Sequence, residues 1–69
     1  MNKKSAELTD RQLQIARLVA QGLTSGQIAE QLSIVLRTVE THLSAIFRKL
    51  KVGSREELIA TLAADSKRR

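Results

Sequence analysis

The chain has 69 residues, of which 42% are hydrophobic and 28% charged, and it contains neither cysteine nor proline. This length allows one small domain, and the composition is too apolar for a disordered segment. Without sulfur ligands the chain can build neither a disulfide framework nor a thiolate zinc site, so we expect helix packing to supply its stability. No stretch reaches the roughly 18 apolar residues of a membrane span, and no signal-peptide core follows the first residues, which indicates a cytoplasmic protein.

The charge balance favours a polyanionic partner. Twelve Lys and Arg residues against seven Asp and Glu residues give a formal net charge of +5. A small domain with this excess of basic residues attracts nucleic acid. The net charge alone does not establish a nucleic-acid partner, because several of the basic residues lie at the two ends of the chain. These are Lys3, Lys4, Lys67, Arg68 and Arg69.

Three helix starts are marked by a hydroxyl residue that is followed three positions later by Gln or Glu, the pattern of a capping box. The pairs are Thr9 with Gln12, Thr24 with Gln27, and Ser54 with Glu57. Gly22 lies where a left-handed residue would end the first helix, and Gly53 precedes the last cap. The chain therefore reads as a series of helices.

These signals, with apolar residues repeating at a helical period, predict an all-α, compact four-helix domain that contains a helix-turn-helix. The helices are expected over about 10–21, 25–32, 36–50 and 55–64. We assign residues 1–7 to a flexible N-terminal segment or linker, 8–64 to the domain, and 65–69 to a basic C-terminal tail.

The third expected helix has two contrasting sides. Its apolar stripe, which we expect to face the core, is Val39, Leu43, Ile46 and Leu50, and its opposite side carries Arg37, Glu40, Thr41, Ser44 and Arg48. Such a polar stripe on the second helix of a helix-turn-helix suits the DNA major groove, where base edges are read by donors and acceptors. The alternative is that the stripe is simply the solvated face of a helical bundle, and periodicity alone does not separate the two.

Other chemistries lack the residues they need. His42 is the single histidine and lies beside the apolar stripe, so we interpret it as a packed imidazole and not as a metal ligand or base. With no thiol and only scattered carboxylates, we expect no enzyme activity, no metal, no cofactor and no small-molecule ligand. Phe47 is the sole aromatic residue, which disfavours single-stranded nucleic acid, whose bases stack on several aromatic side chains.

Motifs in register along most of the chain resemble one family. They are LT-x-R at 8–11, A-x-G-L-T at 20–24, Q-I-A at 27–29, TV-x-x-H at 38–42, and then Ile46, Lys49, Leu50, Val52, Ser54 and Arg55. From about Leu8 to Leu62 the chain resembles the LuxR-type (GerE-like) DNA-binding domain of bacterial transcriptional regulators. Sigma-factor region 4 shares part of this pattern but not its final motif. The resemblance implies a four-helix domain whose third helix enters the major groove of double-stranded DNA.

The resemblance also implies roles for individual residues. It assigns Glu40, Thr41 and Ser44 to base edges, and to these we add Arg37 and Arg48 from the polar stripe. It assigns phosphate contacts to Thr24, Ser25, Thr38 and Lys49, and a scaffold role to Arg55. Several positions depart from the family pattern, among them Glu40, Ser44, Val35 and the pair Gly26 and Gln27. Glu40 stands where lysine is common and could accept from a cytosine amino group, and Val35 leaves the third helix without a side-chain cap, at a cost of about 1 kcal/mol.

The last helix has two interpretations. Leu58, Ile59 and Leu62 close the core, or the helix also pairs with a second copy through Ala60, Ala63 and Ala64, as the resemblance suggests. We expect a homodimer on DNA, and a monomer or weak dimer when free. The chain would be the output domain of a response regulator or ligand-responsive regulator, with RNA polymerase as a further partner. The rival interpretation is a helical protein-interaction module with a basic face and no DNA role.

Overall fold

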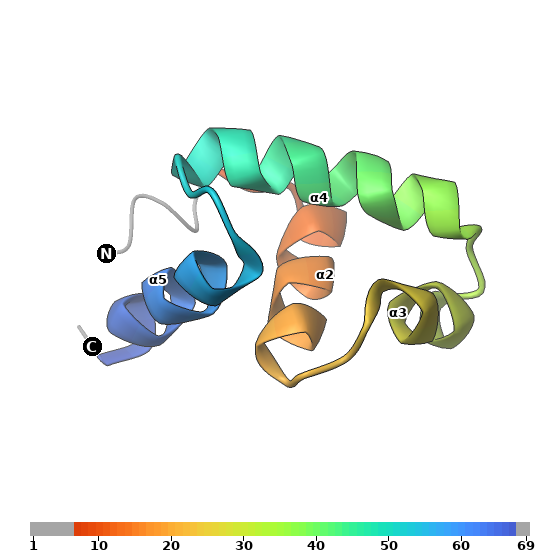
Figure 1. The fold of residues 1–69 in the computed structure, drawn as a ribbon, viewed down its shortest axis with the longest axis horizontal. Helices are drawn as coiled ribbons and strands as arrows, with labels where there is room; N and C mark the ends of the chain where they lie inside the picture. The colour runs from red at the N-terminus through yellow and green to blue at the C-terminus, as the bar shows by residue number, and fades with distance from the viewer. Residues whose placement is uncertain (1–6, 68–69) are drawn as a thin grey trace.

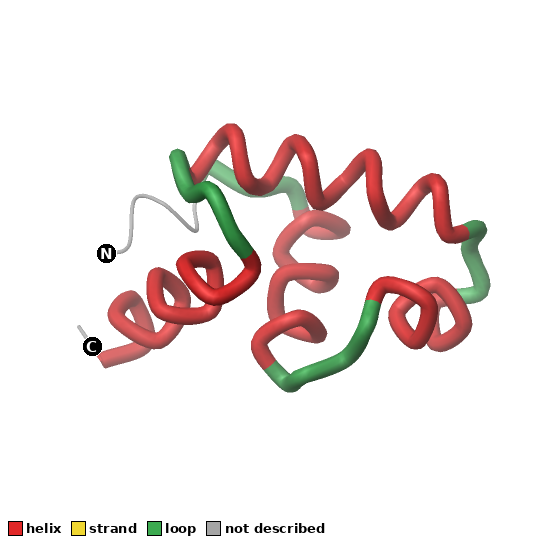
Figure 2. Tube along the Cα trace, viewed as in Figure 1, coloured by secondary structure: helices red, strands yellow, loops and turns green. Residues whose placement is uncertain are grey.

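The computed structural model describes residues 7–67 and contains, within them, four α-helices and no strand. Figures 1 and 2 show helices α2 (Asp10–Ala20), α3 (Ser25–Leu32), α4 (Leu36–Leu50) and α5 (Arg55–Lys67). The prediction of an all-α four-helix domain is therefore confirmed.

Two predicted boundaries differ from the observed ones. Gln21 caps α2 instead of belonging to it, and α5 continues to Lys67, through part of the segment assigned to the C-terminal tail. The extension is understandable, because no glycine or proline interrupts the chain after Arg55. Most of the predicted N-terminal segment and residues 68–69 lie outside the described residues.

Side-chain caps fix the starts of three helices. The Thr9 hydroxyl accepts from the Gln12 amide at 3.1 Å while the Gln12 side chain accepts from the Thr9 amide at 3.2 Å. Thr24 and Gln27 form the same box, with distances of 3.1 and 2.8 Å. Two predicted capping boxes are thus confirmed.

The third predicted box, at α5, is only half formed. The Ser54 hydroxyl accepts from the Glu57 amide at 3.1 Å, as expected. The Glu57 carboxylate, however, accepts from the amide of Gly53 and not from that of Ser54. The carboxylate thus satisfies the amide one residue before the cap. α4 has no side-chain cap at Val35, as predicted.

Left-handed residues end α2, α3 and α4. They are Gly22, Ser33 and Lys51, with φ of 97°, 58° and 58°. The next residue then donates its amide back into the helix, as from Ile34 to the Ala29 carbonyl at 3.0 Å. The role of Gly22 was predicted from the sequence. At the end of α4 the left-handed residue is Lys51, and Gly53 lies two positions after it.

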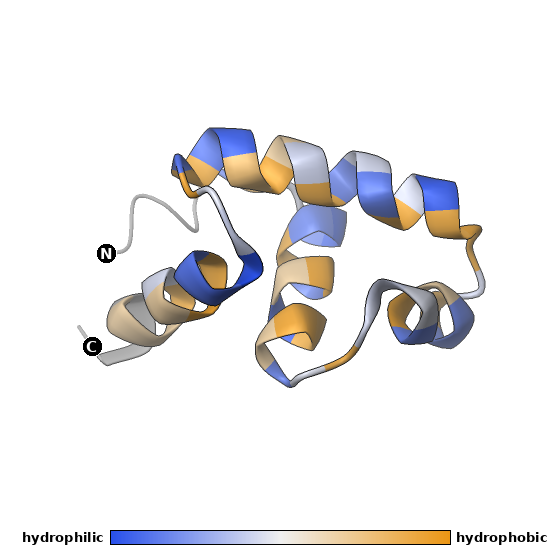
Figure 3. Ribbon diagram, viewed as in Figure 1, coloured by the Kyte–Doolittle hydropathy of each residue, from blue (hydrophilic) through white to orange (hydrophobic). Residues whose placement is uncertain are grey.

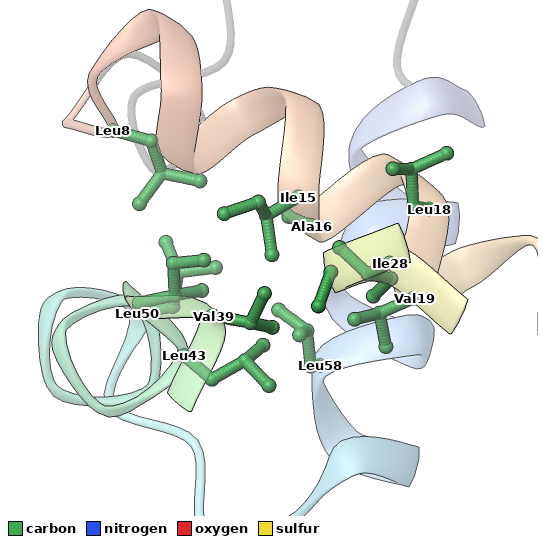
Figure 4. Close-up of a cluster of buried hydrophobic side chains, with 12 residues drawn as sticks. Leu8, Ile15, Ala16, Leu18, Val19, Ile28, Val39, Leu43, Leu50 and Leu58 are labelled. Atoms are coloured by element: carbon green, nitrogen blue, oxygen red, sulfur yellow. The ribbon is translucent and has the colours of Figure 1, made fainter. Parts of the chain in front are cut away.

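A single apolar core joins the helices (Figure 4). α2 contacts the other three helices, and α3 also contacts α4. Figure 1 shows α2 between α3 and α5, with α4 lying across them. The fully buried large side chains are Ile15, Val19, Ile28, Val39, Ile46, Leu50 and Leu58. No helix in the described part of the chain combines the length and the apolar character that crossing a bilayer requires.

Candidate nucleic-acid interface

α3, a turn and α4 form the central structural unit of the candidate site. The turn covers residues 33–35, and its left-handed Ser33 reverses the chain after only eight helical residues. Ile28 and Ala29 of α3 are buried together with Val39 and Leu43 of α4. This packing holds the two helices in contact, and it leaves the opposite side of α4 facing away from the core.

The outward side of α4 carries the predicted polar stripe. Arg37, Glu40, Thr41, Ser44 and Arg48 are all exposed. The structure brings the first four together with Leu36 around one shallow depression on the surface, whereas Arg48 lies outside its lining. Figure 3 shows hydrophilic and hydrophobic residues alternating along α4. The stripe offers cationic, anionic and hydroxyl groups, the mixture of donors and acceptors that base edges require.

The start of α3 is tied to the start of α5. Arg55 donates through Nη2 to the Ser25 hydroxyl at 2.9 Å and through Nη1 to the Leu23 carbonyl at 3.2 Å. These two bonds give a structural basis for the scaffold role that the resemblance assigned to Arg55. Gln27 completes the capping box with Thr24, as predicted.

The predicted phosphate contacts have different surroundings. Thr24 and Lys49 are exposed, whereas Ser25 and Thr38 are half-buried. The Lys49 ammonium donates to the Gln12 side-chain oxygen at 2.9 Å and to the Glu7 carbonyl at 3.2 Å. Sequence reasoning missed this contact, because it joins residues that lie far apart in the chain and Gln12 was interpreted only as part of a cap.

α5 closes the core and exposes alanines on its outer side. Leu58 is fully buried, and Ile59 and Leu62 pack against the core cluster, which confirms the first interpretation of this helix. Ala60, Ala63 and Ala64 are exposed. Their pairing with a second copy of the chain stays a prediction.

His42 is half-buried on α4. Within the described part of the chain, no cluster of three or more His, Cys, Asp or Glu side chains has the arrangement of a metal site.

A short α3 packed against the core through Ile28 and Ala29, followed by a short turn and by an α4 with one exposed polar side, defines a helix-turn-helix domain. The family of bacterial regulatory proteins named luxR (GerE) matches residues 6–62. The chain belongs to this family, and it is a LuxR-type DNA-binding domain of the kind found in bacterial transcriptional regulators.

Three curated relatives illustrate the similarity. The tetrathionate response regulatory protein TtrR of Salmonella typhimurium is 42% identical over 53 residues, which cover 77% of this chain and 26% of the relative. The transcriptional regulatory protein LiaR of Bacillus subtilis is 44% identical over 50 residues, covering 72% of this chain and 24% of the relative. The HTH-type transcriptional regulator MalT of Vibrio campbellii is 33% identical over 58 residues, which cover 84% of this chain and 6% of the relative. The chain thus spans about a quarter or less of these relatives, and no solved structure matched it.

Proposed function

We propose that the chain binds duplex DNA at preferred sequences, with α4 lying in the major groove. The observation that carries the proposal is the exposed stripe of polar side chains on α4, four of which line one depression while the apolar side of the helix is buried. A groove about 12 Å wide admits one helix, and the side chains that face the bases select the sequence.

Within this arrangement the stripe residues divide by chemistry. Arg37 and Arg48 can donate to guanine or to phosphate, and Thr41 and Ser44 can donate or accept at any base edge. Glu40 can only accept, so it repels phosphate and favours the amino group of a cytosine. Because these side chains include donors, acceptors and both signs of charge, they suit the recognition of particular base sequences better than a uniform attraction to the DNA backbone.

Phosphate contacts would come from the start of α3. The Thr24 hydroxyl accepts from the Gln27 amide and the Ser25 hydroxyl accepts from Arg55, so each hydroxyl proton remains available to donate. The amides of the first turn and the helix dipole also favour an anion at this end. The Arg55 guanidinium adds positive charge beside Ser25.

Lys49 can hold α2 and contact phosphate at once. Its ammonium has three donors, of which Gln12 and Glu7 occupy two. Thr38, in the first turn of α4, would add a further contact. Backbone contacts of this kind fix the register of the helix in the groove, while the stripe provides the sequence preference.

The relatives support a proposal about the longer protein in which such a domain works. TtrR is named a response regulatory protein and LiaR a transcriptional regulatory protein, and each is about four times longer than the segment that matches this chain. We therefore propose that this domain serves as the output domain of a response regulator or ligand-responsive regulator. The exposed Ala60, Ala63 and Ala64 would let two copies approach closely on DNA, and RNA polymerase would be a further partner. The domain would be monomeric or weakly dimeric when free.

The test is a selection of binding sites from a random duplex library with the 69-residue chain, followed by competition with an unrelated duplex at several salt concentrations. The proposal expects an enriched sequence that binds at least about a thousandfold more tightly than the unrelated duplex. An unenriched library would contradict it. The rival interpretation, a protein-interaction module with a basic face, predicts that no duplex sequence is enriched.

A further inference from the structure

Two aliphatic side chains at the start of α4 are exposed. Val35 has 66% and Leu36 has 46% of its surface accessible, and they are the large hydrophobic residues that the described part of the chain leaves in solvent. Figure 3 shows the hydrophobic colour of the turn that leads into α4, next to hydrophilic residues of the helix.

The two residues differ in their surroundings. Leu36 lines the depression with Arg37, Glu40, Thr41 and Ser44, whereas Val35 does not. Leu36 lies one helical turn from Glu40, so both side chains belong to the same face of α4. An apolar group is thus built into the lining of a surface that is otherwise polar and charged.

The size of this apolar feature restricts its partner. A stable protein interface buries about 1,200–2,000 Å² in total, far more than one or two aliphatic side chains supply. The DNA major groove, in contrast, displays one methyl group on each thymine among its polar groups. A single leucine beside donors and acceptors matches this mixture.

We propose that Leu36 determines specificity by contacting the C5 methyl group of a thymine, next to the bases that the polar stripe reads. The inference rests on the proposed function and adds to it an apolar recognition element. Removing the thymine methyl, by replacing thymine with deoxyuridine, changes neither the base pairing nor the polar groups in the groove. The substitution therefore isolates this contact.

The experiment replaces each thymine of the selected duplex by deoxyuridine in turn and measures the affinity of the full chain. At one thymine we expect the affinity to fall by about threefold to fourfold, the effect of burying one methyl-sized group. Leu36→Ala should bind the thymine duplex more weakly and lose the difference between the two duplexes at that position. Val35→Ala, an exposed aliphatic residue of the same turn outside the depression, is the matched control and should keep the difference.

The deoxyuridine scan uses the unchanged protein, so its result does not depend on whether a variant folds. Circular dichroism tests whether Leu36→Ala and Val35→Ala keep the helical fold. If a sequence is enriched but no deoxyuridine weakens binding, or if Leu36→Ala keeps the full difference, the inference is wrong while the proposed function stands. If no sequence is enriched at all, the proposed function fails and the inference fails with it.

Discussion

The Lys49 ammonium donates to the side-chain oxygen of Gln12 at 2.9 Å, which links the last turn of α4 to the first turn of α2. Gln12 is a buried polar side chain, with 8% of its surface accessible. Its oxygen also accepts from the Thr9 amide, so one atom joins the capping box to the proposed DNA-binding helix. This relationship ties the fold to the placement of α4.

Lys49→Met should lower the free energy of unfolding by about 1 kcal/mol, the net value of a hydrogen bond that is partly open to water. The effect stays small because the Gln12 oxygen keeps the Thr9 amide as a partner. Urea denaturation followed by circular dichroism measures it. Arg17→Met removes one charge from an exposed position in the last turn of α2 and should change stability by less than about 0.5 kcal/mol. Equal stability of the two variants would show that the Lys49 contact contributes nothing.

Lys49→Met should also weaken binding to every duplex alike. The slope of log affinity against log salt should become shallower by about 1, because one phosphate contact is lost. Arg17→Met is again the control, because it removes the same charge at the end of α2, which lies away from α4 in Figure 1. It tests whether the loss of net charge alone changes the salt slope. An unchanged slope for the Lys49 variant would remove Lys49 from the phosphate contacts and leave it only its structural role.

Arg55→Met should destabilise the domain by about 1–2 kcal/mol, because the Leu23 carbonyl and the Ser25 hydroxyl both lose a charged donor. It should also weaken DNA binding, since the start of α3 is then less well positioned. Glu56→Gln, at the exposed neighbouring position, is the control and should change stability little. Denaturation and duplex titration of both variants test this, and an Arg55 variant that behaves like the Glu56 variant would refute the positioning role.

Two glycines should respond to alanine in opposite directions. Gly22 has a φ of 97° and nothing within 4 Å of an added Cβ, so Gly22→Ala adds backbone strain alone and should cost about 1 kcal/mol. Gly26 lies within α3, and an added Cβ would come no closer than 3.9 Å to the Thr24 hydroxyl. Gly26→Ala should therefore stabilise the domain by about 0.4–1 kcal/mol. Thermal melts measure the melting temperatures of the two variants. If both temperatures moved in the same direction, the result would be inconsistent with a left-handed cap at Gly22.

The sequence was informative where local chemistry decides structure. The helical period identified Val39 and Ile46 as core residues, and the hydroxyl caps identified the starts of α2 and α3. The exposure of Thr41 and Ser44 followed from the same period.

Features that depend on tertiary contact or on uncommon backbone conformations were not predictable in this way. Lys51 adopts a left-handed conformation that lysine rarely takes, and the bonds of Lys49 connect segments that are distant in sequence. The exposure of Leu36 also depends on how α3 and α4 pack at the turn, which periodicity does not specify.

The central claim is that the exposed polar stripe of α4 chooses the DNA sequence. Its most direct test is to repeat the random-site selection with Thr41→Ala, using Gln14→Ala on the exposed side of α2 as the control. We predict that Thr41→Ala lowers affinity for the original site by about 2- to 10-fold, the value of about 0.5–1.5 kcal/mol for one neutral hydrogen bond, and changes the enriched sequence while leaving binding to unrelated duplex nearly intact. An enriched sequence and affinity identical to those of the Gln14 variant would contradict the claim.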